Sequence, residues 1–455
     1  MESKGPAEAG GPAGSGAGVT VPAVWPGFSI SRLPRILFGA GRSGELPGAV
    51  RGFGSRALVV VRGPGFTESA DWARLRGALE SAGVAVAGEA VSGEPSPSIV
   101  DEIVARHQGS GSGSGSGTGS VTGSVTGVSP TRGPVPAPVD VVVGIGGGSV
   151  LDTAKAVAGL LIPGNSVMDH LEGIGPQLPY VGPSVPFIAV PTTAGTGSEA
   201  TRNAVLSVRG PGGFKKSFRD ESLVARVAIV DPDLLADCPP GLIAGNGMDA
   251  LTQLLESYVS VRANPFTDAL ALSGLACVRD GLLAWFEAAA TRRGAGGPGS
   301  VAAAARQRMA YAALCSGICL AQAGLGAVHG LASPLGAQFP IPHGVACGAT
   351  LVAATRVNIA ALEARDPGNV ALSRYAAAGW LFSGTAGADD REARSALVPA
   401  LETLTARLGV PRLSAFGIAE SSIPALVADA RGSSMKTNPI VLTDEEIAAI
   451  LRASL

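Results

Sequence analysis

The stretch Gly144-Ile-Gly-Gly-Gly-Ser-Val-Leu-Asp-Thr-Ala-Lys155 decides the fold class. The valine run Val141–Val143 before it predicts a buried strand, and the apolar run Ala156–Leu161 after it predicts a helix. Adjacent glycines between strand and helix let the backbone approach an anion closely, and the helix N-terminus adds a partial positive charge. The pattern therefore indicates a phosphate-binding turn, with an ordinary glycine-rich turn of an α/β protein as the equal alternative.

A second stretch favours the binding interpretation. Phe187–Val190 predicts another buried strand, which runs directly into Pro191-Thr-Thr-Ala-Gly-Thr-Gly-Ser-Glu-Ala-Thr201. Hydroxyl groups and glycines at the carboxyl end of a parallel strand suit a ligand in the crevice of an open sheet. Further short motifs are spread along the chain: Pro34-Arg-Ile-Leu-Phe-Gly39, Val227-Ala-Ile-Val-Asp-Pro232, Gly247-Met-Asp-Ala-Leu251, Pro342-His-Gly344 and Thr437-Asn-Pro439.

In this order, the motifs resemble those of the iron-containing (group III) alcohol dehydrogenase family over nearly the whole chain. The resemblance implies that the first stretch is the pyrophosphate loop and the second is the threonine loop on the nicotinamide side. It also implies a cleft lysine at Lys215, for which a solvated surface lysine is nearly as good an interpretation. Asp152 has an alternative role as a carboxylate near the positive end of the helix dipole. The implied cofactor-binding residues are Gly146, Gly147, Gly148, Ser149, Asp152, Lys155, Thr192, Thr193, Thr196 and Ser198.

The hydrophobic pattern divides the chain into two domains. Short Val- and Ile-rich strands alternate with helices up to about residue 235, and Ala/Leu-rich helical segments follow. We expect a disordered tail over residues 1–24, a Rossmann-like α/β dinucleotide-binding domain over 25–235 and an all-helical domain over 236–455. The Gly/Ser-rich run 109–139 has too few apolar residues to pack and predicts a flexible insertion. The resemblance implies an active site in the cleft between the two domains.

The composition excludes several function classes. With 34 basic and 36 acidic residues in 455 and only 4% aromatic residues, nothing favours nucleic acid or an anionic membrane as a partner. No uninterrupted run of 18 apolar residues predicts a membrane span, and residues 1–24 lack the pattern of a signal peptide. Five cysteines without a framework spacing favour a reducing cytoplasm. We expect a small-molecule substrate and leave a homodimer open.

The choice between NAD and NADP depends on the end of the first long strand. Family members that prefer NAD carry an acidic residue there, which accepts hydrogen bonds from the ribose diol and repels a 2′-phosphate. Here the strand ends in Val61-Arg62-Gly63-Pro64-Gly65, and the Arg62 guanidinium can pair with a phosphate. The sequence therefore favours NADP slightly over NAD.

The metal site departs from the family pattern, in which one Asp and three His hold a divalent metal ion. Asp249 matches the Asp, but the ligand position one turn later on the same helix is Gln253. We assign His329 to a cleft histidine that is not a ligand, so the next ligand position falls on Ser333 and His343 fills the last. Neutral oxygen groups replace imidazole poorly as ligands of Fe²⁺ or Zn²⁺. The prediction is a weak site on Asp249, Gln253 and His343, or no metal.

Together these features predict an NAD(P)-dependent oxidoreductase that transfers hydride between nicotinamide and a small alcohol/aldehyde or ketone pair. The expected catalytic residues are His329, His343 and Lys215, with an imidazole delivering the proton that accompanies hydride transfer. Two alternatives stay open. One is a maleylacetate-reductase-like reduction of an activated keto acid, although no Arg cluster near the cleft motifs favours a dicarboxylate. The other is a non-catalytic nucleotide-binding protein with a decayed metal site.

Overall fold

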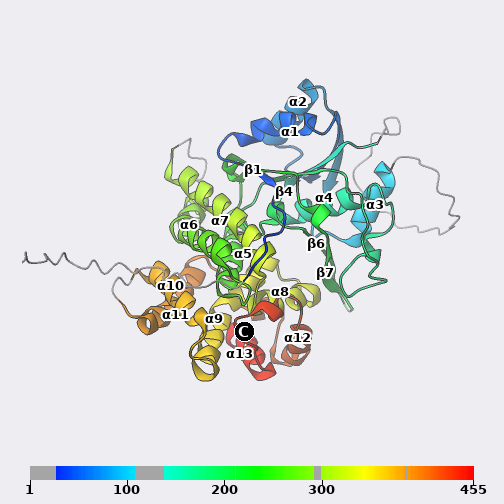
Figure 1. Cartoon of the computed structure of the whole chain (residues 1–455). Helices are drawn as coiled ribbons and strands as arrows, with labels where there is room; N and C mark the ends of the chain where they lie inside the picture. Colours follow the sequence, from blue (N-terminus) through cyan, green and yellow to red (C-terminus); the bar gives the residue numbers. More distant parts are fainter. Residues whose placement is uncertain (1–26, 109–137, 211, 292–298, 385–387) are drawn as a thin grey trace, which may run out of the picture.

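A computed structural model of the chain describes residues 27–108, 138–210, 212–291, 299–384 and 388–455. The expected tail 1–24 and almost all of the expected insertion 109–139 lie outside these residues. An α/β domain is followed by a helical domain, which confirms the predicted fold class (Figure 1). The large sheet ends with Val230 and the first long helix begins at Pro240, so the boundary expected at 235/236 falls between them.

The α/β domain is built on a six-stranded sheet in which every neighbouring pair is parallel. Its strands, in the spatial order of the sheet, are β1 (Arg35–Phe38), β8 (Val227–Val230), β5 (Phe187–Pro191), β4 (Val141–Gly146), β2 (Arg56–Arg62) and β3 (Ala85–Val91). The helices of this domain are α1 (Leu46–Arg51), α2 (Ala70–Ser81), α3 (Pro97–His107) and α4 (Gly148–Leu160).

Both faces of the sheet are buried, which explains why its strands are continuous apolar runs. In β2, Val59 and Val61 pack into one core cluster together with Leu75 of α2. The alternate residues Leu58 and Val60 face the opposite way, into a second cluster that includes residues of α3 and α4. Because all six strands are parallel, their carboxyl ends lie at one edge of the sheet, and the loops after β4 and β5 begin at this edge.

An antiparallel hairpin, which the sequence reading did not identify, follows the threonine loop. It consists of β6 (Asn203–Val208) and β7 (Phe214–Arg219). The hairpin places Lys215 opposite Ser207 and brings β7 against helix α8 (Ala327–Gln338) of the second domain. The position of Lys215 near the second domain therefore depends on this hairpin.

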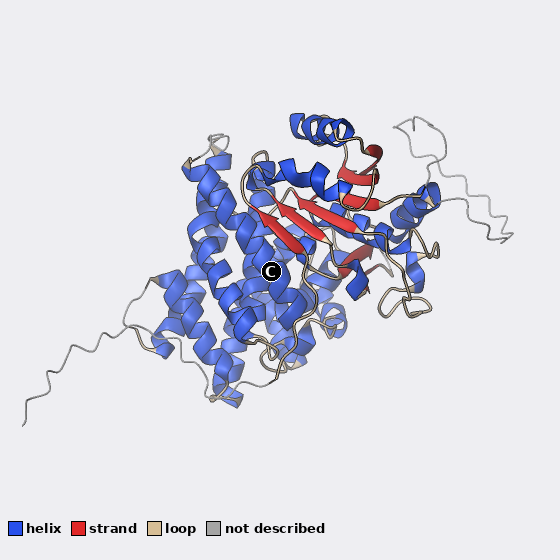
Figure 2. Cartoon of the chain, turned by 45° about the horizontal axis from the view of Figure 1, so that its top comes forward, coloured by secondary structure: helices blue, strands red, loops and turns tan. Residues whose placement is uncertain are grey.

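The second domain is helical throughout its described part, as the Ala/Leu-rich segments predict (Figure 2). The central helix α5 buries most of its length, and α6 packs a stripe of residues spaced by three or four positions, including Leu275, Val278 and Leu282. Asn264 begins α6 with a capping box and Ser300 caps α7. The helices are α5 (Pro240–Val259), α6 (Pro265–Ala290), α7 (Val301–Ala323), α8 (Ala327–Gln338), α9 (His343–Arg365), α10 (Val370–Ser383), α11 (Asp390–Arg407), α12 (Ile423–Asp429) and α13 (Asp444–Ser454).

Two of these helices, α6 and α9, are long and apolar enough to cross a membrane, and the bent pair α7–α8 would pass the same test as a broken span. In α9, 67% of the most apolar window is buried inside the chain, so its composition is accounted for by the core of the domain. In α6 the buried share is 39%. The expectation that no segment spans a membrane stays a prediction.

Candidate active site

The two loops assigned to the cofactor lie side by side at the carboxyl edge of the sheet, because β4 and β5 are neighbouring parallel strands. Glycine is required where the loops touch. A Cβ on Gly148 would lie 2.7 Å from Thr196 Oγ1, and a Cβ on Gly147 would lie 3.0 Å from Thr193 Oγ1. The glycines thus serve contact between the two loops as well as the approach of a ligand.

Helix α4 begins at Gly148, where the two loops touch. Gly147 is the N-cap residue, and no side chain caps the helix. The N–H groups of its first turn are therefore suited to a bound anion such as a pyrophosphate. The half-buried residues around it are within reach of a ligand, and they are Gly147, Gly148, Ser149, Thr192, Thr193 and Thr196.

Asp152 and Lys155 lie one turn apart on α4, and both form hydrogen bonds with the threonine loop. The Lys155 ammonium donates to Ser198 O at 2.8 Å, Ser198 Oγ at 3.0 Å, Thr201 Oγ1 at 3.0 Å and Asn203 O at 2.7 Å. Asp152 accepts a hydrogen bond of 2.5 Å from Ser198 Oγ. Lys155 is completely buried, and all the donors of its ammonium are used inside the protein. The structure therefore places Lys155 behind the loop, where it positions Ser198.

The buried pair of Asp152 and Lys155 is electrostatically unusual. Burial raises the pKa of Asp152 and lowers the pKa of Lys155, because each charge has lost its water. The two charged groups are 3.7 Å apart, which offsets part of that cost. Each of the two charges is therefore stabilised mainly by the other and by the hydrogen bonds to the threonine loop.

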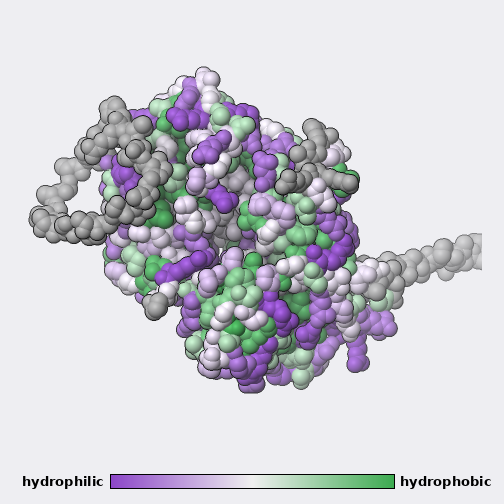
Figure 3. All heavy atoms as spheres, turned by 180° about the vertical axis from the view of Figure 1, so that it is seen from behind, coloured by the Kyte–Doolittle hydropathy of each residue, from purple (hydrophilic) through white to green (hydrophobic). Residues whose placement is uncertain are grey.

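The threonine loop is also the contact between the two domains. A Cβ on Gly195 would lie 2.7 Å from Asn246 Cβ of α5, and one on Gly197 would lie 2.4 Å from the Gly317 backbone of α7. Gly197 has a φ of +61°, which also favours glycine. Viewed from behind, the molecular surface is hollowed near its middle, where the α/β and helical domains meet (Figure 3).

Lys215 and Arg62 approach this junction from two strands. Only 13% of the Lys215 side chain is exposed and its Nζ lies 4.0 Å from Glu94 Oε2, so Lys215 is not a solvated surface lysine. Its charge acts on His343, a residue of α9. Arg62 ends β2, next to β4, and is exposed.

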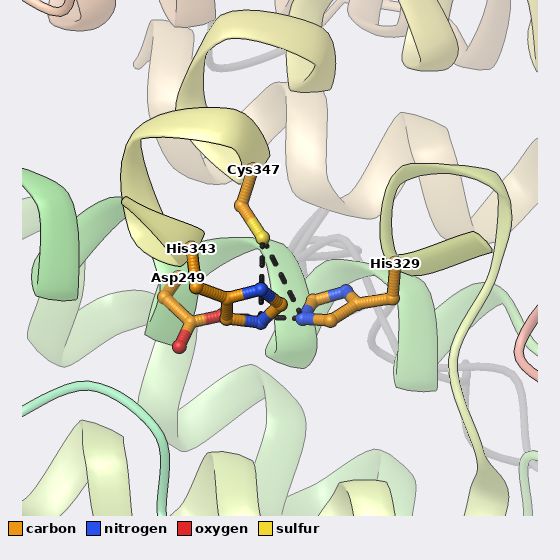
Figure 4. Close-up of side chains that lie close together, drawn as sticks. All are labelled: Asp249, His329, His343 and Cys347. Carbon is orange, nitrogen blue, oxygen red and sulfur yellow. Dashed lines mark hydrogen bonds and ion pairs between the residues drawn. The ribbon is translucent and has the colours of Figure 1, made fainter. Parts of the chain in front are cut away.

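On the helical side, four donor groups converge. Asp249 of α5, His329 of α8, and His343 and Cys347 of α9 each direct one ligand atom to a common point, and these atoms all lie within 4.8 Å of one another (Figure 4). Asp249 Oδ1 lies 3.1 Å from His329 Nε2 and 3.8 Å from His343 Nε2. Cys347 Sγ lies 3.7 Å and 3.9 Å from the same two nitrogens.

The ring of His329 is held by Glu256, a residue that the sequence reading did not single out. Glu256 Oε2 is 2.7 Å from His329 Nδ1, and Glu256 Oε1 accepts a 2.6 Å hydrogen bond from the backbone N–H of Val328. A carboxylate at Nδ1 keeps a proton on that nitrogen and fixes the ring so that Nε2 is directed at the cluster. Glu256 lies three residues after Gln253 on α5, and His329 lies on α8. The contact between them could be known only once the two helices were placed in the fold.

Comparison with known proteins identifies the family. Residues 136–232 match the family model for iron-containing alcohol dehydrogenase, and residues 243–455 match the C-terminal model of the Fe-containing alcohol dehydrogenase family. The chain belongs to the iron-containing alcohol dehydrogenase family.

Its relatives in this family include both dehydrogenases and reductases. The chain is 32% identical to alcohol dehydrogenase 4 of Saccharomyces cerevisiae over 316 residues, which covers 69% of this chain and 75% of the yeast protein. It is 30% identical to lactaldehyde reductase of Escherichia coli over 397 residues, covering 86% and 89%. A solved structure of a 1,3-propanediol oxidoreductase superposes with a TM-score of 0.78 at 28% identity, covering 94% of this chain and all of that one. The protein is thus an oxidoreductase that transfers hydride between a nicotinamide cofactor and a small alcohol/carbonyl pair.

Within this iron-containing alcohol dehydrogenase, the metal cluster differs from the one expected from the sequence. The sequence placed His329 away from the metal and Ser333 in the ligand position, and the structure has the opposite arrangement of the two side chains. His329 Nε2 faces Asp249, whereas Ser333 Oγ donates to the backbone carbonyl of His329 on its own helix at 3.5 Å. The two positions are one helical turn apart, and the spacing alone could not decide which of them faces α5.

Gln253 also has a different role from the one predicted. Its amide Nε2 donates to Asp249 Oδ1 at 3.1 Å, and its Oε1 accepts from Ser316 Oγ of α7 at 2.9 Å. The carboxylate accepts only, so the amide must turn its nitrogen toward Asp249 and its carbonyl oxygen away. The structure brings Cys347 to the cluster instead, a residue that the sequence reading did not propose as a ligand.

The charges of the cluster are strongly coupled. Although burial acts the other way, His343 and the hydrogen bond from His329 lower the pKa of Asp249 to about 2. Burial, with Lys215 next, lowers the pKa of His343 to about 3. Burial opposes a charge on His329 as well, but Cys347, Glu256 and Asp249 raise its pKa. His343 is thus neutral at pH 7, whereas the neighbouring carboxylates favour a proton on His329.

Proposed function

We propose that this family member works as a reductase of small aldehydes or ketones, prefers NADPH to NADH, and holds a divalent metal ion with Asp249, His329 and His343. The observation that carries the proposal is convergence at the domain junction. The threonine loop packs on α5 one turn before Asp249, and Lys215 of the hairpin acts on His343. A reducing, cytoplasmic location is part of the proposal and is supported by the five free cysteines.

The preference for NADPH is supported by the place of Arg62. Val61 pairs with Ile145, so Arg62 leaves the sheet next to the glycine loop that follows β4. Its side chain is exposed, and a guanidinium can form two hydrogen bonds with a phosphate. A 2′-phosphate on the adenosine ribose would therefore meet a positive charge at the end of β2.

The donor set fits a divalent cation. Asp249 Oδ1 and His329 Nε2 are 3.1 Å apart, and both are electron-rich once Glu256 holds the imidazole proton on Nδ1. Such a pair needs a proton or a cation between the two atoms. A metal ion bound there would supply Lewis-acid polarisation of a carbonyl oxygen.

The side chains around the site have separate tasks in this proposal. Glu256 keeps the proton on His329 Nδ1, and Gln253 orients Asp249 through its amide. Both imidazoles then serve to hold the ion, and neither acts as the proton donor. The His343 side chain is 26% exposed, whereas those of Asp249 and His329 are 2% and 6% exposed. Solvent therefore reaches the cluster at His343. We propose that water entering beside His343 supplies the proton that accompanies hydride transfer.

The test is steady-state oxidation of NADPH against a panel of small aldehydes, ketones and one activated keto acid, before and after chelator treatment. We expect turnover with at least one aldehyde or ketone, loss of turnover after chelation and recovery when a divalent metal is restored. Turnover restricted to the keto acid would favour the maleylacetate-reductase-like alternative. Cofactor binding without turnover on any substrate would favour a non-catalytic nucleotide-binding protein.

A further inference from the structure

The helical side of the site has lost one imidazole donor and gained a sulfur donor. Gln253 is buried one turn after Asp249, and both ends of its amide are engaged, with Asp249 and with Ser316. Turning its carbonyl oxygen toward the cluster would break both hydrogen bonds and set two acceptors against one another. Gln253 therefore orients Asp249, and α5 supplies no second donor to the cluster beside Asp249.

Cys347 occupies the opposite side of the same point. It lies one turn after His343 on α9, so the two side chains share a face of the helix (Figure 4). The thiol is completely buried, and its sulfur is directed at the nitrogens of His329 and His343. The buried Cys319 of α7 instead donates to the backbone carbonyl of Thr267 on α6.

The distances between donors match the edges of one coordination tetrahedron. Ligand atoms about 2.0–2.3 Å from a tetrahedral zinc ion lie roughly 3.3–3.6 Å from one another. Here the carboxylate oxygen lies 3.1 and 3.8 Å from the two imidazole nitrogens. The sulfur lies 3.7 and 3.9 Å from them. These four distances are close to tetrahedral edges, and the remaining two, between the imidazole nitrogens and between the oxygen and the sulfur, are no longer than 4.8 Å. A single ion can therefore contact all four groups after small side-chain rotations.

We propose that Cys347 is the fourth protein ligand of the metal and that the resulting set of one carboxylate, two imidazoles and one thiolate selects zinc over iron. The sulfur binds as a thiolate, and the thiol proton leaves to solvent as the ion enters. The carboxylate and the thiolate together balance the 2+ charge of the ion. Thiolate is a soft donor and, with imidazole, is typical of zinc sites. This inference rests on the metal site of the proposed function and specifies its ligands and its metal.

The test is X-ray absorption at the zinc edge on the full-length protein, depleted with chelator and reconstituted with one equivalent of Zn²⁺. We expect a sulfur scatterer at about 2.3 Å beside nitrogen and oxygen scatterers at about 2.0–2.1 Å. Cys347→Ser should remove the sulfur scatterer and weaken zinc affinity at least tenfold. Cys315→Ala is the matched control, because Cys315 is equally buried in α7 but lies outside the cluster, and it should keep both.

A second variant guards against misfolding of Cys347→Ser. Adding Gln253→His to Cys347→Ser should restore tight zinc binding through a nitrogen donor, with no sulfur scatterer. Bound zinc with only nitrogen and oxygen neighbours in the wild type would overturn the assignment of Cys347, and so would a preference for Fe²⁺ over Zn²⁺ in competition. Failure of the proposed function is distinguishable, because it would appear as absence of NADPH turnover while the zinc–sulfur signal is intact.

Discussion

Replacement of Lys155 by methionine tests whether the cofactor side depends on a buried charge. Methionine keeps the length of the side chain, so little volume is lost. The ammonium that bonds to four oxygen atoms disappears, and Asp152, 3.7 Å away, loses its counter-charge. Removing one partner of a buried ion pair costs about 3–5 kcal/mol, because the remaining charge stays buried and unpaired.

The lower end of this range applies here. Asp152 keeps hydrogen bonds from Ser198 Oγ at 2.5 Å and from the Val205 N–H at 3.1 Å, which continue to stabilise its charge. We expect the free energy of unfolding of the α/β domain to fall by about 3 kcal/mol. NADPH affinity should also fall, since Ser198 and the threonine loop lose the group that holds them in place.

Urea denaturation followed by circular dichroism measures the first effect, and NADPH fluorescence titration measures the second. Lys216→Met is the control, because Lys216 is exposed on β7, and it should change stability by no more than about 0.5 kcal/mol. Asp152→Asn combined with Lys155→Met should lose less than the sum of the two single changes. A loss below about 1 kcal/mol for Lys155→Met would refute the structural role of the ammonium.

Three further predictions concern the same domain. Gly147→Asp should weaken NADPH binding more than about tenfold in a fluorescence titration, because its Cβ would lie 3.0 Å from Thr193 Oγ1 and its charge opposes a pyrophosphate; unchanged binding would reject the loop assignment. Wild-type protein should bind NADPH more tightly than NADH, and Arg62→Ala should remove most of that difference; equal affinities in the wild type would contradict it. Burial raises the pKa of Glu199 to about 7, above its unfolded value of about 4.3, so its contribution to stability is present below pH 4 and lost as the pH rises through 7. Glu199→Gln should therefore stabilise the protein by about 3 kcal/mol at pH 8 relative to pH 4 in urea titrations, and an unchanged pH profile would count against this assignment.

The cofactor side was predictable because its signals are local. A valine strand, a glycine turn and a helix are contiguous in sequence, and parallel strands bring their carboxyl ends to one edge without any long-range information. The position of Lys155 was less predictable. Its ammonium bonds to residues more than forty positions away, so burial behind the loop could be known only once β5 and β6 were placed.

On the helical side, the structure and the sequence-based expectation share some residues and differ in others. The family pattern located Asp249 and His343, but the choice between residues 329 and 333 depended on which face of α8 turns toward α5. Glu256 decides it, by holding both the ring of His329 and the first turn of α8. Cys347 has no metal-site spacing with another cysteine, so the sequence alone did not connect it with the metal position. The hairpin that carries Lys215 was not predicted, because Lys and Ser interrupt its apolar alternation.

The substitutions on the helical side are linked through one geometric rule. On a helix, residues four apart share a face, so a ligand pair can be built on α5 from Asp249 and residue 253 or on α9 from His343 and residue 347. The family pattern uses the first pair, and this chain has the donors for the second. A ligand pair on α9 requires that residue 253 does not also bind the ion. The carbonyl oxygen of Gln253 accepts a hydrogen bond from Ser316 on α7 and is therefore turned away from the cluster. The amide still orients Asp249, so the direction of the carboxylate would be unchanged if α9 supplied the fourth donor as proposed. If Cys347 is the fourth ligand, as proposed above, a change at either position alone would give the ion one ligand too few or one too many, so Gln253 and Cys347 should be substituted together in any attempt to return the site to the family pattern.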